Sequence, residues 1–193
     1  MSQFKIHSIS TAPTPAQALL EGLLKKYGFV PNLHGGLAEA PAALQAYIEL
    51  TALFDQTSFS PTERQVVLLA ASAENLCTYC VAAHSVIARH MVKADPSIVN
   101  ALRNFEPLPD PKLDALATFT RAVVKNRGVV CGKTLDNFIT AGYTLVHVLE
   151  VVLGVTMKTL SNYTNHVIDT PLDAAFQVEA WDAPADWNSK QCA

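Results

Sequence analysis

Paired helix-start signals constrain this chain more than any other feature of its sequence. Ser60-Pro61 places a capping hydroxyl before a proline, and Glu63, three residues after the serine, completes a capping box. Proline suits the first turn of a helix and is excluded from the helix interior, where its ring clashes and its N–H is missing. The same pairing recurs at Thr14-Pro15, where Thr14 is the expected cap, and at Asp95-Pro96 and Asp110-Pro111. These signals predict helices with defined starts along most of the chain.

The spacing of apolar residues fills in the segments between these starts. The stretch 30–36 contains a proline and two glycines and is expected to be a turn-rich connection. Val129–Cys131 is the one strand-like fragment, and it is short. Apolar positions three and four residues apart predict helices over residues 14–28, 41–54, 61–73, 78–92, 96–103, 111–126, 133–141 and 143–163. We therefore predict an all-α fold, a helical bundle.

Two of these segments carry too little polar surface for an isolated helix. Val66–Ala73 is apolar on nearly all sides, which predicts a helix in the centre of a bundle or of an oligomer. Val146–Val155 is similarly apolar. Because large exposed apolar surfaces in soluble proteins mark interaction sites, these stretches predict a homo-oligomer.

A dithiol follows the first of these apolar helices. Cys77-Thr-Tyr-Cys80 is followed four residues later by His84, so the three side chains fall on one helix face at i, i+3 and i+7. A nearby imidazole or a helix N-terminus lowers the pKa of a thiol and makes its thiolate usable. Cys80 and His84 are an i,i+4 pair, so His84 is expected to take the Cys80 proton or to stabilise the thiolate. We assign Cys80 as the attacking thiol and Cys77 as the resolving one.

This arrangement suits reduction of a peroxide. The Cys80 thiolate would attack a peroxide oxygen to give a sulfenic acid, which Cys77 would convert to a disulfide that an external reductant reopens. Glu74 joins the same face if the helical path is unbroken, and is then a candidate proton relay; a break at Asn75-Leu76 would move it. Tyr79, between the cysteines, is expected to be a packing residue.

A metal site, a structural disulfide and a thioredoxin fold each need features that the sequence lacks. A zinc site would need a fourth ligand, and no second Cys-x-x-Cys or histidine pair has suitable spacing, so no metal and no cofactor is expected. A structural disulfide across so short a loop adds little stability. A thioredoxin fold would need strands that alternate with helices. Cys131 and Cys192 stand apart from the pair and are expected to be incidental thiols or small buried side chains.

Composition sets the class of protein. The 193 residues are half apolar, enough for a sizeable core, and predict a single all-helical domain over 1–193, with N-terminal helices in 1–60, the buried helix and the dithiol helix in 61–92, and C-terminal helices in 93–193. The net charge of −3 offers no basic surface for nucleic acid. No window approaches the roughly 18 apolar residues of a membrane span. The first residues lack the pattern of a secretory signal, so a cytoplasmic location is expected.

The run Glu74-Asn-Leu-Cys-Thr-Tyr-Cys-Val-Ala-Ala-His, preceded by Ser60-Pro-Thr-Glu-Arg and the buried helix, resembles the AhpD-like alkylhydroperoxidase branch of the carboxymuconolactone decarboxylase family. Val30-Pro-Asn-Leu, Ala94-Asp-Pro and Asn162-Tyr-Thr-Asn-His resemble its peroxidase-related members, so the similarity spans most of the chain.

The resemblance implies an all-helical fold assembled as a homo-oligomer, a trimer or a larger ring such as a hexamer. It also implies a cofactor-free peroxidase, an oxidoreductase of antioxidant defence, that takes electrons from a dithiol or from a thioredoxin-like or lipoyl-type reductant. The family's peroxide-reactive cysteine maps to Cys80, its resolving cysteine to Cys77 and its motif histidine to His84.

One position departs from the family pattern. The resemblance calls for a proton-relaying glutamate twelve residues before the first motif cysteine, and Gln65 stands there. Since an amide does not exchange protons at neutral pH, either Glu74 replaces it, Gln65 orients a water, or the physiological task differs. The same dithiol would serve a disulfide reductase or a redox-sensing module, which stay as alternatives. A carboxymuconolactone-type decarboxylase does not depend on a dithiol, so the intact Cys-x-x-Cys argues against it.

Overall fold

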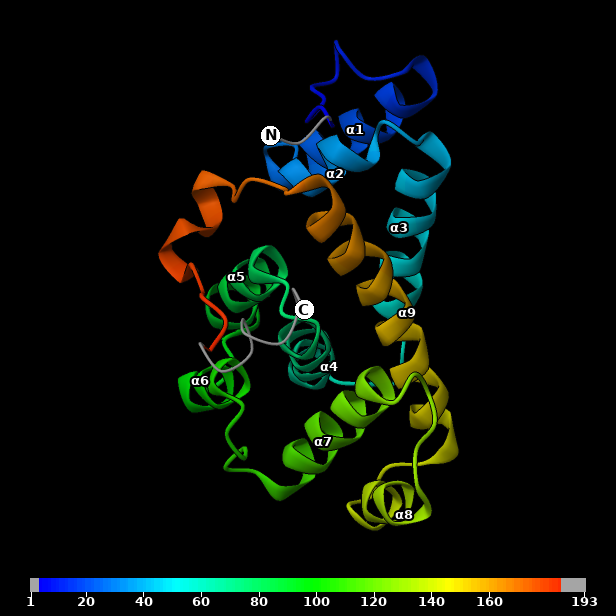
Figure 1. Cartoon of the computed structure of the whole chain (residues 1–193), viewed down its shortest axis with the longest axis vertical. Helices are drawn as coiled ribbons and strands as arrows, with labels where there is room; N and C mark the ends of the chain where they lie inside the picture. The colour runs from blue at the N-terminus through cyan, green and yellow to red at the C-terminus, as the bar shows by residue number, and fades with distance from the viewer. Residues whose placement is uncertain (1–3, 185–193) are drawn as a thin grey trace, which may run out of the picture.

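The computed structural model describes residues 4–184 as helices joined by turns and loops, with no β-strand in that range (Figure 1). The predicted all-α class is confirmed, and Val129–Cys131 forms no strand. The α-helices are α1 (Thr14–Tyr27), α2 (Asn32–Leu37), α3 (Pro41–Phe54), α4 (Pro61–Glu74), α5 (Thr78–Val86), α6 (Pro96–Asn104), α7 (Pro111–Lys125), α8 (Gly132–Thr140) and α9 (Leu145–Ile168). A π-helical segment, η1 (Ile87–Val92), extends α5, and a 3₁₀ segment, η2 (Ala174–Glu179), follows α9.

Most of the predicted caps form. At α4 the Ser60 hydroxyl accepts from the Glu63 N–H at 3.2 Å, and the Glu63 carboxylate accepts from the Ser60 N–H at 2.9 Å. Asp95 and Asp110 cap α6 and α7 in the same way through their carboxylates. The prediction that Thr14 caps α1 was wrong. Thr14 is the first helical residue, and Pro13 occupies the N-cap position.

The segment predicted as a turn contains the short helix α2. Its two glycines act as close-packing residues instead of turn formers. A Cβ on Gly35 would lie 2.7 Å from the His7 carbonyl oxygen, and a Cβ on Gly36 would overlap the side chain of Ile168 at the end of α9. Glycine here lets α2 approach its neighbours closely, a use that sequence alone does not distinguish from a turn.

Helix α4 forms the centre of the molecule, and Figure 1 shows it among α5, α7 and α9. All eight residues of Val66–Ala73 are buried, which confirms the prediction for this stretch. Helix α9 lies against α3 and α4 and comes close to both at Gly154. A Cβ at that position would lie 2.7 Å from a Phe54 ring carbon and 2.8 Å from a Val67 methyl carbon. The small residue therefore sets how deeply α9 packs.

The chain breaks between α4 and α5 at the position that decides where Glu74 points. Leu76 has a left-handed backbone conformation, with φ of 55°, so the two helices are not continuous. The Cys77 N–H bonds the Ser72 carbonyl across the break, and the Asn75 amide donates to Asn162 of α9. As a result Cys77 becomes the residue that caps α5, and α5 takes a new direction.

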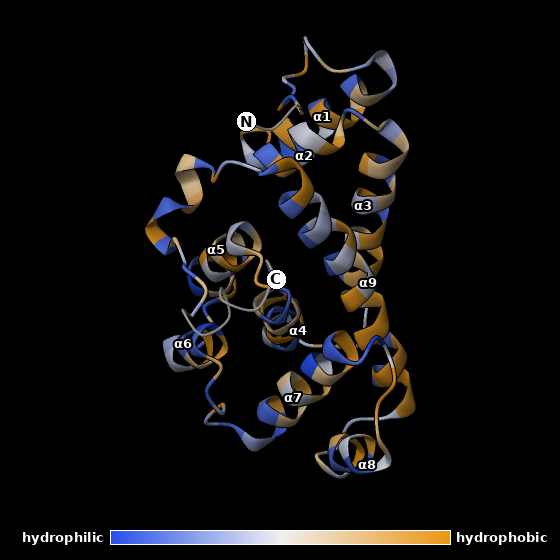
Figure 2. Cartoon of the chain, viewed as in Figure 1, coloured by the Kyte–Doolittle hydropathy of each residue, from blue (hydrophilic) through white to orange (hydrophobic). Residues whose placement is uncertain are grey.

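Apolar residues run along much of α9 (Figure 2). Several of them are largely exposed in the single chain, among them Leu145, Val146, Leu149 and Val167. Within residues 4–184 no single helix is long and apolar enough to cross a membrane; only α8 and α9 taken together pass that test, and they are bent by 114°.

Candidate active site

The two motif cysteines lie at the start of α5, deep in the core. Cys77 is the residue before the first turn and Cys80 lies within it; both are free thiols and both are at most 2% exposed. The positive end of a helix favours a thiolate at this position. The Cys-x-x-Cys pattern therefore places the dithiol at a helix N-terminus, where a reactive thiolate is favoured.

Helix α9 supplies the polar surroundings of the sulfurs. The Asn165 side-chain amide donates to the sulfur of Cys80 at 3.2 Å and to that of Cys77 at 3.5 Å. The Ser161 hydroxyl lies 3.8 Å from the Cys80 sulfur. One amide thus holds both sulfurs in a common orientation.

Lys158 of α9 completes this group, and it is fully buried. Its ammonium donates to Nε2 of His84 over 3.0 Å. Burial disfavours the charged form of Lys158, but the Cys80 sulfur beside it, with Tyr47 and Cys77, raises its pKa above the ordinary lysine value. The neighbouring sulfurs and Tyr47 therefore favour the ammonium form of Lys158 inside the core.

The two thiols have opposite ionisation tendencies. Burial opposes the Cys80 thiolate, but a hydrogen bond from Cys77, the Lys158 ammonium and the Ser161 hydroxyl together lower the Cys80 pKa well below the usual thiol value. Burial and the neighbouring Cys80 raise the pKa of Cys77 well above it. These surroundings favour a thiolate on Cys80 and a proton on Cys77.

His84 belongs to the site, but both ring nitrogens are engaged with other groups. Nε2 accepts from Lys158, so Nδ1 carries the hydrogen and donates to the side-chain oxygen of Gln65 at 3.1 Å. Burial and the Lys158 charge hold the His84 pKa well below its ordinary value, so the ring is neutral. The expected Cys80–His84 pair is therefore bridged by Lys158, and Gln65 contributes an acceptor to the same chain of hydrogen bonds.

Glu74 lies elsewhere. The break at Leu76 removes the unbroken helical path on which its role as a relay depended, and Glu74 comes near Arg121 and Lys125 of α7. Burial raises its pKa, although those cations oppose the shift. The structure brings Cys77, Cys80, His84 and Gln65 together and leaves Glu74 out.

Sequence reasoning missed the contribution of α9. Lys158, Ser161 and Asn165 stand at i, i+3 and i+7, the same one-face spacing as the motif residues of the dithiol segment. Lys158 is also the only lysine or arginine in residues 145–168. A single cation on the polar stripe of an otherwise apolar helix was the available signal, because burying it requires an anion nearby.

Tyr79 is buried as expected of a packing residue, and it also ties down the segment after α9. Its hydroxyl donates to Asp173 at 2.5 Å, and the same carboxylate accepts from the Asn32 N–H at 3.1 Å. The Tyr79 ring packs edge-on against Phe176 of η2. This residue therefore fixes η2 beside α5.

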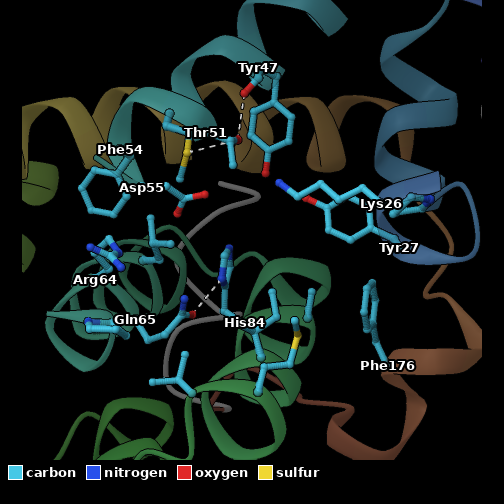
Figure 3. A pocket seen from close by; sticks show the side chains of 18 of the residues that line it. Lys26, Tyr27, Tyr47, Thr51, Phe54, Asp55, Arg64, Gln65, His84 and Phe176 are labelled. Atoms are coloured by element: carbon cyan, nitrogen blue, oxygen red, sulfur yellow. Dashed lines mark hydrogen bonds between the residues drawn. The ribbon is translucent and has the colours of Figure 1, made fainter. Parts of the chain in front are cut away.

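A cavity of about 470 Å³ opens beside His84 and Gln65, with Tyr79 also in its wall (Figure 3). Tyr47 and His84 project into it from α3 and α5. Lys26, Asp55 and Arg64 bring charge to its lining. Most of the wall is aromatic or aliphatic: Tyr27, Phe54, Tyr79, Ile87, Met91, Met157 and Phe176. Apolar walls with a few convergent polar groups are typical of small-molecule sites.

Within residues 4–184 no three side chains of histidine, cysteine, aspartate or glutamate gather as a metal site. Cys131 is exposed, and its pKa is lowered by hydrogen bonds with Thr134, whose hydroxyl lies 3.3 Å from its sulfur. Cys192 lies outside the described residues. The dithiol stands apart from Cys131 in the fold.

Comparison with solved structures finds the same fold over nearly the whole chain. A peroxidase-related protein from Ralstonia eutropha JMP134, described as an alkylhydroperoxidase AhpD core, has a TM-score of 0.79 and 25% sequence identity, with 91% of this chain and 94% of that chain covered. A peroxidase-related protein from Silicibacter sp. TM1040 has a TM-score of 0.75 and 18% identity, with 90% and 92% covered. The debrominase Bmp8 has a TM-score of 0.77 and 18% identity, with 93% and 96% covered.

The family model for the carboxymuconolactone decarboxylase family matches residues 38–122, which include both motif cysteines, His84 and Gln65. A search of curated proteins finds no match. The family match, the all-helical fold and the AhpD core with which it aligns agree with the resemblance carried by the Cys-x-x-Cys segment. Residues 38–122 therefore match the carboxymuconolactone decarboxylase family, and the chain as a whole has the fold of the AhpD core from Ralstonia eutropha JMP134.

Proposed function

We propose that the protein is a thiol peroxidase that reduces organic hydroperoxides through the Cys77–Cys80 dithiol. The observation that carries the proposal is the division of roles between the sulfurs. Cys80 is held as a thiolate by Lys158 and Asn165, while Cys77 keeps its proton beside it. A nucleophilic thiolate with a protonated thiol in reach is what a sulfenic acid cycle requires.

The chemistry balances without a cofactor. The Cys80 thiolate attacks the terminal oxygen of the hydroperoxide, the O–O bond breaks, and an alkoxide leaves while Cys80 becomes a sulfenic acid. Cys77, once deprotonated, attacks the Cys80 sulfur and expels hydroxide, which leaves as water. The dithiol is oxidised by two electrons and the peroxide is reduced to an alcohol and water. A dithiol reductant then reopens the disulfide.

The size and lining of the cavity favour an organic substrate over hydrogen peroxide. A space of about 470 Å³ is within the range of sites that hold small organic molecules. Aromatic and methionine side chains around His84 would stabilise an apolar group attached to the peroxide.

The burial of the dithiol also bears on its reductant. With both sulfurs at most 2% exposed, a folded protein disulfide has no direct approach to Cys80. This argues for a small dithiol, such as one of the lipoyl type, as the electron donor, and against a general protein disulfide reductase.

A turnover assay tests the function. Wild-type protein with an organic hydroperoxide and a small dithiol donor should consume peroxide over many turnovers, and Cys80→Ser should abolish this. Cys77→Ser should instead be trapped after one peroxide equivalent as a sulfenic acid or mixed disulfide on Cys80, visible by intact mass. Consumption that survives in Cys80→Ser, or trapping on Cys77, would overturn the assignment of roles.

Reductive dehalogenation is a second candidate. Five aromatic side chains line the cavity, Tyr27, Tyr47, Phe54, Tyr79 and Phe176, and would suit a flat ring. The dithiol would supply two electrons, converting an aryl bromide to the arene and bromide while the disulfide forms. Bmp8, a protein of the same fold, is a debrominase and was crystallised as its C82A variant with 2,3,4-tribromopyrrole. Bromide release from a bromopyrrole, measured beside peroxide consumption, separates the two candidates.

A further inference from the structure

Lys158 lies between Cys80 and His84, the two residues that the sequence motif predicts to act together. It is fully buried, it donates to Nε2 of His84 over 3.0 Å, and it lies beside the Cys80 sulfur. A buried ammonium costs several kcal/mol unless an anion compensates it. A compensating anion must therefore lie next to Lys158.

Among the described residues, only Cys80 is suited to be the anion. The two histidines nearby have lowered pKa values and are neutral, and the raised pKa values of Tyr47 and Cys77 keep both protonated. The titratable groups that face Lys158 are Cys77, Cys80 and His84 from the dithiol segment, Tyr47 from α3 and His34 from α2. No carboxylate is in this set, so a Cys80 thiolate and the Lys158 ammonium form the buried ion pair.

We propose that Lys158 is the catalytic acid of this site: its ammonium balances the Cys80 thiolate and then gives the proton that the leaving alkoxide takes. The inference rests on the peroxidase function proposed above and names the proton donor for it. Lys158 lies close enough to the Cys80 sulfur to lower its pKa, and the same ammonium donates to His84.

Every proton transferred during oxidation of the dithiol is accounted for by Lys158 and Cys77. When the thiolate attacks, the alkoxide takes a proton from Lys158 and leaves as an alcohol, so the thiolate and ammonium charges disappear together. The neutral Lys158 amine removes the Cys77 proton, and the Cys77 thiolate attacks the sulfenic sulfur. The expelled hydroxide takes that proton back from Lys158 and leaves as water. The oxidised site then holds a disulfide and a neutral amine.

Reduction restores the starting state. A dithiol donor brings two protons with its two electrons, one for Lys158 and one for Cys77. The buried site is therefore neutral overall in both resting states, as its low-polarity surroundings demand. A carboxylate at position 65 would add a further charge to this balanced pair, which gives a physical reason for Gln65 where the family resemblance calls for glutamate.

His84 and Gln65 act as positioning residues in this scheme. Gln65 accepts from Nδ1 of His84 and so leaves Nε2 free of hydrogen and pointed at Lys158. The His84 ring, held in this way, keeps the Lys158 ammonium next to the Cys80 sulfur, and neither Gln65 nor His84 changes charge during the reaction.

Titration of the thiolate tests the ion pair without any substrate. Cys131→Ser/Cys192→Ser protein, which keeps only the dithiol, is titrated by the ultraviolet absorbance of the thiolate. Lys158→Met is expected to raise the Cys80 pKa by about two pH units or more, since the nearest opposite charge is gone. Lys133→Met, at an exposed lysine of α8, is the matched control and should titrate like the parent. An unchanged titration in a folded Lys158→Met protein would overturn the proposal.

Proton exchange on oxidation tests the acid role in the wild-type protein, so it does not depend on a variant that folds. If Lys158 supplies the proton, one equivalent of hydroperoxide oxidises the dithiol with no net proton taken from weakly buffered solution. If the alkoxide takes its proton from solution instead, one proton per disulfide is consumed as the thiolate disappears; uptake that a stopped-flow pH indicator records in the same phase as thiolate loss would overturn the acid role. A thiolate that depends on Lys158 in a protein that leaves hydroperoxides unreacted would instead end the peroxidase function and support the ion pair.

Discussion

At the scale of single residues, the site is controlled by groups that do not themselves react. Gln65 is the clearest case, because its oxygen decides which nitrogen of His84 carries hydrogen. A carboxylate there would favour the imidazolium, and Nε2 would then no longer accept from Lys158.

We therefore expect Gln65→Glu to raise the His84 pKa and to slow oxidation of Cys80 by peroxide roughly tenfold or more, while the fold is kept. Histidine NMR titration and single-turnover oxidation measure the two effects. Gln56→Glu, at an exposed position of the loop after α3, is the matched control. A variant that oxidises at the wild-type rate with a protonated His84 would contradict the positioning role of Gln65.

His34 makes the stability of the folded protein depend on pH. It lies between the rings of Tyr27 and Tyr47, and burial, with the charges of Lys26 and Lys158, lowers its pKa from 6.5 to about 4. The unfolded chain therefore binds a proton between these pH values that the folded protein does not bind. Stability must fall as the pH drops from 6.5 toward 4, by an order of 3 kcal/mol for this group alone.

We expect His34→Phe to flatten this part of the pH profile, because phenylalanine fills a similar space and binds no proton. Urea unfolding at several pH values between 4 and 7 measures the slope. His166→Phe, at an exposed position of α9, should keep the wild-type slope. Equal slopes in His34→Phe and wild type would show that His34 titrates alike in both states.

At the scale of elements, the site depends on how closely α9 packs, because α9 carries Lys158, Ser161 and Asn165. Gly154 lies one turn before Lys158 and leaves no room for a Cβ against Phe54 and Val67. The distance between α9 and its neighbours is therefore determined at Gly154, one turn away from the reacting groups.

Gly154→Ala is expected to destabilise the protein by about 1–3 kcal/mol through overpacking and to lower the rate of Cys80 oxidation as Lys158 shifts. Gly132→Ala, where a Cβ would meet nothing within 4 Å, is the control. Denaturant unfolding and single-turnover oxidation report the two effects. A fully active, wild-type-stable Gly154→Ala would show that α9 adjusts without moving the site.

The elements were largely predictable, because helix starts and breaks are local. The ends of α3 at Pro41 and Phe54 follow from a proline and an apolar repeat, and the α4 cap follows from three side chains. The helix α2 was not predictable, since its glycines serve contacts with Ile168 and with the backbone of His7, which are distant in sequence.

At the scale of the whole molecule, the exposed face of α9 needs a cover. Leu145 and Leu149, one turn apart, are 72% and 71% exposed, and Val152 and Val167 extend the apolar surface. We propose that copies of this chain pack on this face, in line with the homo-oligomer predicted from the apolar run 146–155.

Sedimentation should then show a homo-oligomer, and Leu149→Lys should weaken it by placing a charge in the interface. Val178→Lys, at a valine of η2 that is 74% exposed, is the control and should leave assembly unchanged. A wild-type protein that stays monomeric at micromolar concentration would contradict the proposal.

Some features of this protein depend on local sequence and others on packing between distant segments. Sequence patterns alone predicted most of the helices, the buried run of α4 and the dithiol with His84, since each of these features depends on residues close together in the chain. The packing of the folded chain places Glu74 outside the site and brings Lys158, Ser161 and Asn165 into it, which local patterns do not predict. The reason is physical: one left-handed residue, Leu76, redirects α5, and the charge of Cys80 is set by side chains about 80 residues away on α9, whose position depends on packing against α3 and α4.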